Sequence, residues 1–200
     1  MKARDNPFAT ARLHRLAYRP EGWTWDGLFE RLHALDCRAA VVGPKGSGKT
    51  ALLDELAHRL SAGGRRAAAI RIDGEDAFQK RLDARLTELA PFSTDDVVLL
   101  DGADRLGPWA WRRLVRRTAD AGGLVITSHR PGRLPTLVEC TASPELLDAL
   151  LRRIEPDNAD QMRDAAHALF RQHSGNLRDV FRGLYDMCAA RQDSMTPHST

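Results

Sequence analysis

One segment of the chain combines glycines, a lysine and a hydroxyl side chain at a spacing suited to holding an anion. It reads Gly43-Pro44-Lys45-Gly46-Ser47-Gly48-Lys49-Thr50 and fills every fixed position of the pattern GxxxxGK[ST]. The glycines let backbone amides converge on a phosphate, and a following helix adds the positive end of its dipole. We therefore predict a phosphate-binding loop whose contacts extend to Ala51, with Lys49 on the β- and γ-phosphates and Thr50 as a Mg²⁺ ligand.

A carboxylate with matching chemistry follows an apolar run. Residues 97–100 are all Val or Leu, and Asp101 comes directly after them. Such a run is typical of a buried strand that delivers its last side chain to the carboxyl edge of a parallel sheet. Asp101 is therefore predicted to hold Mg²⁺ together with Thr50, although a strand that simply ends at a turn Asp has the same local sequence.

Hydrophobic periodicity indicates the elements that position these groups. Up to residue 140, short apolar runs alternate with amphipathic segments of helical length, as in an α/β domain with a parallel sheet, and beyond it only helices are predicted. The predicted strands span 39–42, 67–72, 97–100, 124–127 and 137–140, and the predicted helices span 25–35, 50–60, 75–89, 108–121, 144–154, 158–173 and 176–190.

Composition narrows the class of protein. A chain of 200 residues with 42% hydrophobic and 28% charged residues is long enough for one globular core and a small subdomain, and it excludes a disordered chain. Its three cysteines, Cys37, Cys140 and Cys188, form no CxxC pair. No apolar run approaches the roughly 20 residues of a membrane span, and the start of the chain is charged, so we expect a cytoplasmic protein.

The order of these motifs resembles a known group of nucleotide-binding proteins. A phosphate loop, a strand ending in Asp101, a later strand ending in Thr127-Ser128-His129 and a helical C-terminal part are similar to the additional-strand P-loop ATPases, in particular AAA+ and the related STAND/NACHT group. The resemblance covers roughly residues 25–190. It implies an α/β three-layer sandwich with a parallel five-stranded sheet ordered 5-1-4-3-2 and a small C-terminal helical lid.

The same resemblance divides the chain into parts and implies what they do. The predicted parts are an N-terminal segment at 1–24, a P-loop ATPase core at 25–140, a lid at 141–190 and a frayed tail at 191–200. The implied activity is slow, regulated hydrolysis of ATP with Mg²⁺ that rearranges the lid or an oligomer and acts on a separate partner. A nucleotide-dependent switch without hydrolysis and, less favoured, a small-molecule kinase are the alternatives.

Further roles come from the resemblance alone. Thr127 or Ser128 is similar to sensor 1, which contacts the γ-phosphate or the attacking water. Arg178, in the segment Gly175-Asn176-Leu177-Arg178, is similar to the sensor 2 arginine of the lid.

The sequence departs from most AAA+ ATPases directly after Asp101. Those proteins place there a Glu that activates water, whereas this chain has Gly102, with an acid at Asp104. This arrangement resembles the STAND/NACHT version, so Asp104 becomes the candidate general base or water-orienting group.

Positive charge is concentrated in one segment. The whole chain has a net charge of +3, whereas residues 104–133 contain seven Arg and two Asp, which gives +5. At 100° per residue, Arg112, Arg113, Arg116 and Arg117 fall within about 140° of a helix, leaving Trp111, Leu114 and Val115 to face the core.

Three interpretations of this basic face remain open. It is a solvated helix face, a surface for DNA, RNA or a protein partner, or the source of an arginine finger in a nucleotide-dependent homo-oligomer. The candidate fingers are Arg116, Arg117, Arg130 and Arg133.

Overall fold

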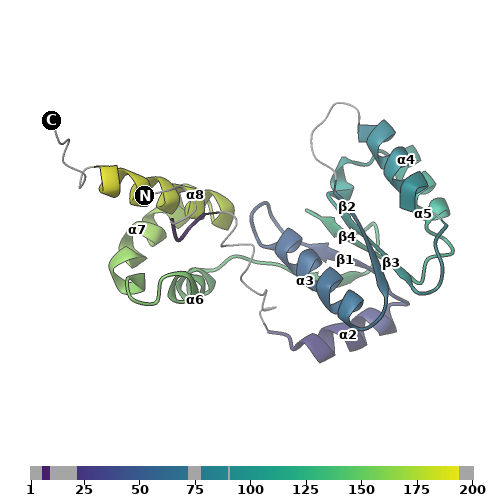
Figure 1. The fold of residues 1–200 in the computed structure, drawn as a ribbon, viewed down its shortest axis with the longest axis horizontal. Helices are drawn as coiled ribbons and strands as arrows, with labels where there is room; N and C mark the ends of the chain where they lie inside the picture. Colours follow the sequence, from purple (N-terminus) through teal and green to yellow (C-terminus); the bar gives the residue numbers. More distant parts are fainter. Residues whose placement is uncertain (1–5, 10–21, 72–77, 90, 194–200) are drawn as a thin grey trace. The chain divides into compact units, whose positions relative to one another are not determined.

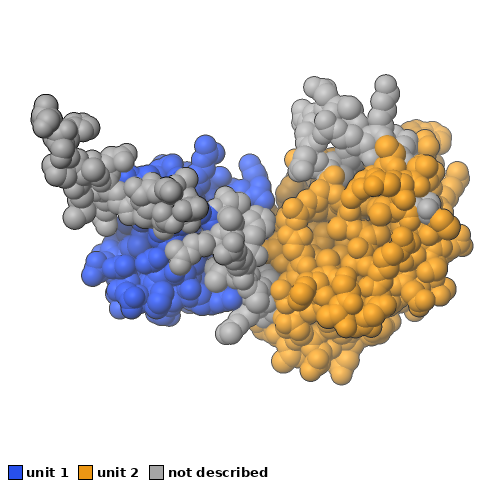
Figure 2. Space-filling view, viewed as in Figure 1, with its two compact units in different colours: residues 1–17, 45–48, 141–200 blue, residues 18–44, 49–140 orange. Residues whose placement is uncertain are grey.

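The computed structural model describes residues 6–9, 22–71, 78–89 and 91–193 of the chain (Figure 1). Contacts divide the chain into two units (Figure 2). The sheet unit comprises residues 18–44 and 49–140, and the helical unit comprises residues 1–17, 45–48 and 141–200. The predicted strand end at 72, the predicted helix start at 75–77, most of the N-terminal segment and residues 194–200 lie outside the described residues.

The sheet unit is built on one parallel five-stranded sheet. Its strands are β1 (Arg38–Val42), β2 (Arg66–Arg71), β3 (Asp96–Asp101), β4 (Gly123–Ser128) and β5 (Thr136–Glu139). They lie in the order β2-β3-β4-β1-β5, and every pair of neighbours is parallel. The predicted order, 5-1-4-3-2, is confirmed.

Helices cover both faces of the sheet, which explains the unbroken apolar strands. The sheet unit contains α2 (Trp25–Ala34), α3 (Lys49–Ala62), α4 (Phe78–Leu89) and α5 (Pro108–Arg117). Val97 and Leu99 of β3 belong to a cluster with α2 and α3, whereas Val98 and Leu100 belong to a cluster with α4 and α5. Successive strand residues point to opposite faces, so both sets must be apolar.

The parallel register brings the ends of three strands to one edge. Val42 of β1 is paired with Ser128 of β4, and Leu100 of β3 is paired with Ile126 of β4. The segments that follow β1, β3 and β4 therefore leave the sheet on the same side, where parallel sheets present their ligand-binding loops.

Helix α5 is shorter than predicted, and one of its residues, Val115, does not face the core as predicted. It ends at Arg117 rather than at residue 121, and the hydroxyl of Thr118 donates to Leu114 O at 3.0 Å just past its last turn. This local bond competes with continuation of the helix. Ala110 and Leu114 are buried, but Val115 is 37% exposed, so its predicted place in the core is wrong.

The helical unit has a core of its own. It consists of α6 (Pro144–Ile154), α7 (Ala159–Gln172) and α8 (Leu177–Asp193), with a separate hydrophobic cluster. The described N-terminal residues join it: Phe8 stacks on Phe181 with ring centroids 6.1 Å apart, and Asn6 donates to Tyr185 O at 2.9 Å.

A buried carboxylate ties strand β3 to its neighbour. Asp96, 3% exposed, accepts two hydrogen bonds from the guanidinium of Arg66 on β2 and others from the backbone amide and hydroxyl of Ser93. The Arg66 bonds, with those from Ser93, hold the pKa of the Asp96 carboxyl well below its usual range in spite of its burial.

We predict that the Asp96 carboxylate makes the stability of the fold decrease at acidic pH. A lowered native pKa stabilises the folded state above the unfolded pKa of about 4, and this contribution is lost as the pH falls toward the native pKa. The variant Asp96→Asn should lower the free energy of unfolding at neutral pH by about 1.5–3 kcal/mol and flatten its decline below pH 4. Urea unfolding over a pH series measures both effects.

The adjacent exposed carboxylate supplies the control. Asp95→Asn should leave both the stability and its pH dependence close to those of the wild type, because Asp95 is exposed. Equal behaviour of the two variants would show that the buried network is not the source of the acid sensitivity.

Candidate functional site

The glycine-rich segment forms a turn between β1 and α3, as its pattern predicts. Lys49 is the first residue of α3 and is only 9% exposed. Its ammonium donates to Gly43 O and Pro44 O, both at 2.7 Å, so the lysine side chain folds back over its own loop. A buried cation held by backbone carbonyls is positioned to attract an anion to the same turn.

Glycine is required within this turn. Gly46 has φ +79°, a left-handed conformation that side chains with a Cβ rarely adopt. A Cβ built on Gly46 would also lie 1.8 Å from the Oδ1 atom of Asn176 within the helical unit, which includes residues 45–48. Both the backbone conformation and the lack of space for a Cβ atom therefore require glycine at position 46.

Asp101 is the centre of a hydrogen-bonded group at the carboxyl edge of the sheet. The hydroxyl of Thr50 donates to its Oδ2 at 2.8 Å, and the hydroxyl of Thr127 donates to its Oδ1 at 2.6 Å. Thr127 also accepts from the amide of Gly102 at 2.8 Å. Three segments that are distant in sequence, the phosphate loop and the ends of β3 and β4, thus meet at one carboxylate.

Asp104 forms a second polar group beside the end of β4. It lies in the short helix η2 (Ala103–Arg105) and accepts from Ser128 Oγ at 2.8 Å and from the backbone amide of His129 at 2.8 Å. The Nδ1 atom of His129 is 3.1 Å from the same carboxylate. Asp104 is therefore held firmly in place, and His129 joins the predicted residues as a member that the sequence analysis did not single out.

The backbone explains the missing glutamate. Gly102 has φ +92° and precedes η2. A glutamate in this left-handed conformation would be strained, so the turn that follows Asp101 favours glycine. The acid nearest along the chain is instead Asp104, carried by η2.

Comparison with known proteins places this site in a family. Residues 39–157, more than half of the chain, match the family described as "ATPase family associated with various cellular activities (AAA)". The chain belongs to the AAA family. The search of curated proteins found no match to the chain.

The donor set of this AAA protein fits a nucleotide with Mg²⁺. Thr50 and Asp101 offer neutral and charged oxygen atoms next to each other, and oxygen is the ligand that Mg²⁺ prefers. Ser47 Oγ, in a side chain 2% exposed, has no hydrogen-bond partner among the described residues. A buried hydroxyl of this kind, at the centre of a phosphate loop, suits a polar ligand. In the described part of the chain, no group of three or more His, Cys, Asp or Glu residues is arranged to hold a metal by itself.

The structure separates the four candidate arginine fingers into two kinds. Arg117 donates to the hydroxyl of Thr87 on α4 at 3.1 Å. Arg133 lies over the ring of Trp111, 5.1 Å from its centroid, and donates to Leu106 O. Arg116 and Arg130 have exposed side chains.

The lid residue singled out by sequence, Arg178, lies in the first turn of α8 with an exposed side chain. Asn176, two residues earlier, has a buried Oδ1 atom without a hydrogen-bond partner among the described residues, while its amide group donates to Asp179. Local sequence gives no signal for a site residue at Asn176, because an asparagine before a helix is ordinarily a cap.

None of the helices described is long and apolar enough to cross a membrane.

We predict that the hydroxyl of Thr127 is essential to the Asp101 group. Thr127→Val keeps the shape of the side chain but removes a donor to Asp101 and the acceptor of the Gly102 amide. Leaving these half-buried groups unpaired should lower the free energy of unfolding by about 1–3 kcal/mol, measured by urea denaturation. Thr127→Ser retains the hydroxyl and should lose clearly less; equal losses would show that the methyl group, and not the hydrogen bonds, stabilises this edge.

Proposed function

We propose that this protein is a cytoplasmic, ATP-binding regulatory ATPase of the AAA family that hydrolyses ATP slowly with Mg²⁺ and acts on a separate partner. The observation that carries the proposal is the meeting of Thr50, Asp101 and Thr127, since it joins the phosphate loop to the metal-binding carboxylate. The family match supports ATPase chemistry in general.

In this proposal the loop residues 43–51 bind the phosphates. Lys49 exchanges its carbonyl partners for phosphate oxygens, and backbone amides at the start of α3 add their donors. Thr50 and Asp101 hold Mg²⁺, which supplies positive charge that stabilises the transferring phosphoryl group when it is bound.

Asp104 supports the hydrolytic step as a water-orienting group. In that step a water oxygen bonds to the γ-phosphorus, the bond from the γ-phosphorus to the β,γ-bridging oxygen breaks, ADP leaves, and the proton of the water passes to a nearby acceptor. Asp104 already accepts hydrogen bonds from Ser128 and His129, and these hold its carboxylate in a fixed position. A carboxylate that orients the water, in place of a glutamate directly after Asp101, is consistent with slow turnover.

Slow turnover also follows from the backbone at position 102. Because Gly102 has a left-handed conformation, the acid usual in rapid AAA+ ATPases is replaced by Asp104 on η2. We propose that the protein is a STAND/NACHT-like regulator rather than a motor. Thr127 and Ser128 share the sensor 1 role, Thr127 through Asp101 and Ser128 through Asp104, and Arg178 is the sensor 2 candidate of the lid.

A nucleotide-dependent homo-oligomer is part of the proposal. An arginine finger must reach the nucleotide of a neighbouring subunit. This favours Arg116 and Arg130, whose side chains are exposed. Arg117 and Arg133 make contacts within the chain and are less favoured. Sedimentation with and without a non-hydrolysable ATP analogue tests this assembly, and a monomer under both conditions would contradict it.

We predict that Lys49→Ala abolishes most phosphate release from ATP. Loss of the loop cation should lower the steady-state rate with Mg²⁺ by about a hundredfold, because charge stabilisation of the phosphoryl group is removed. The matched control is His58→Ala, an exposed position on α3, which should retain the wild-type rate. A wild-type protein that binds ATP through Lys49 but releases no phosphate would be a nucleotide-dependent switch instead of an enzyme.

We predict that Asp104→Asn acts on kcat and not on ATP binding. Asparagine keeps an oxygen that accepts hydrogen bonds but lacks the charge that orients or deprotonates water, so kcat should fall by about a hundredfold while KM for ATP changes little. Asp120→Asn, at an exposed carboxylate that follows α5, is the control. An unchanged kcat in Asp104→Asn would remove Asp104 from the mechanism.

A further inference from the structure

Helix α5 presents an indole ring where the fold does not need one. Trp109 is 82% exposed, far more than Trp23, Val115 and Met187, the other exposed large apolar residues described, at 36–37%. The helix packs on the sheet through Ala110 and Leu114, with Trp111 partly buried beside them. Trp109 is absent from that core, so its exposed ring is available to a partner.

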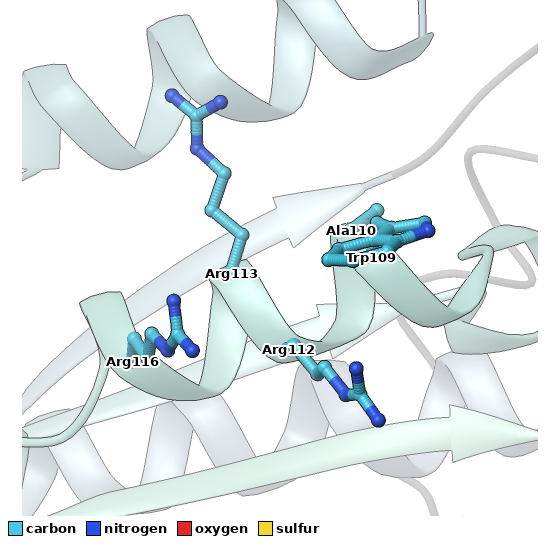
Figure 3. Close-up of a pocket in the computed structure, with 5 residues that line it drawn as sticks. All are labelled: Trp109, Ala110, Arg112, Arg113 and Arg116. Carbon is cyan, nitrogen blue, oxygen red and sulfur yellow. The ribbon is translucent and has the colours of Figure 1, made fainter.

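The exposed ring borders a basic cavity. A cavity of about 360 Å³ is lined by Trp109, Ala110, Arg112, Arg113 and Arg116 (Figure 3). The Arg112 guanidinium lies 5.7 Å from the centroid of the Trp109 ring, within the range of a cation–π contact. Figure 3 shows Arg112 and Arg113 extending from the helix in different directions.

The charged residues described on this surface are all arginines. Helix α5 contains four arginines and no acidic residue, and none of the described residues that line the cavity carries a carboxylate. This positive charge favours an anionic ligand. Arg117, the fourth arginine of α5, instead contacts Thr87 of α4. Arg112, Arg113 and Arg116 are the arginines of α5 that line the cavity.

We infer that the surface of Trp109, Arg112, Arg113 and Arg116 binds single-stranded nucleic acid. A single strand combines regularly spaced phosphates, which pair with guanidinium groups, with unpaired bases, which stack on an aromatic ring. A duplex offers the same phosphates but keeps its bases stacked on one another, and an acidic peptide offers carboxylates without a series of flat rings. Only the single strand uses both the arginines and the exposed indole.

This inference is separate from the proposed ATPase activity. The surface lies on α5, whereas the phosphate loop lies between β1 and α3, and the only residue common to the two proposals is Arg116, a candidate arginine finger. Binding of a single strand is measured without nucleotide, so its failure would leave the ATPase proposal untouched, and the reverse also holds.

The experiment measures binding of the full chain to a fluorescein-labelled oligothymidine of about 16 nucleotides over a range of salt concentrations. The wild type should bind with an affinity that declines steeply with salt. Trp109→Ala should weaken binding by about tenfold through loss of base stacking, whereas Trp109→Phe should retain most of the affinity. Replacing Arg112, Arg113 and Arg116 together by Ala should reduce the slope of log affinity against log salt by about two, since each phosphate contact on a single strand contributes about 0.7.

A charge-matched variant separates this surface from the overall charge. Replacing the exposed Arg152, Arg171 and Arg182 of the helical unit by Ala removes the same charge and should leave the salt slope unchanged. Circular dichroism checks that each variant is folded. Binding that is absent, that is equal for a duplex of the same length, or that is unaffected by Trp109→Ala would overturn the inference. Altered oligomeric size of Trp109→Ala with unchanged binding to the single strand would assign the surface to a second copy of the chain.

Discussion

The carboxylate of Asp101 is the group on which the rest of the site depends. It accepts from Thr50 on one oxygen and from Thr127 on the other, so it links the start of α3 to the ends of β3 and β4. These segments come together only because β3 and β4 are parallel neighbours and β4 in turn pairs with β1. A single charged group, held by two hydroxyls, thus joins the nucleotide-binding loop to the sheet, and a metal bound there would be positioned by the same contacts.

A backbone constraint follows from this arrangement. The chain turns directly after Asp101 with Gly102 in a left-handed conformation, and this turn begins the short helix that carries Asp104. The acid is thereby placed next to Ser128 and His129 at the end of β4. The two neighbouring residues of β4 consequently serve different carboxylates: Thr127 contacts Asp101, and Ser128 contacts Asp104. Thr127 and Ser128 contact different carboxylates because successive side chains of a strand point in opposite directions.

Most of the sheet was predictable because its local signals agree. The three central strands, β1, β3 and β4, are buried on both faces, so their apolar runs are not interrupted by polar residues. The strand order was correctly implied by the family resemblance, which local periodicity alone does not provide. Helix α5 shows where periodicity fails. The predicted helix continues through residues 118–121, but the hydroxyl of Thr118 bonds to Leu114 O and the helix ends at Arg117. Val115, predicted to face the core, is left exposed.

The sequence by itself determined the phosphate loop, the carboxylate that ends β3, and the basic composition of α5, because each of these is a property of neighbouring residues. Tertiary structure decided how separate segments meet. It paired Thr127 with Asp101 and Ser128 with Asp104, it brought Arg117 to Thr87 and Arg133 to Trp111, and it left Trp109 exposed beside three arginines. Such contacts depend on the register between strands and on which distant segments lie next to each other, and local sequence does not encode either one.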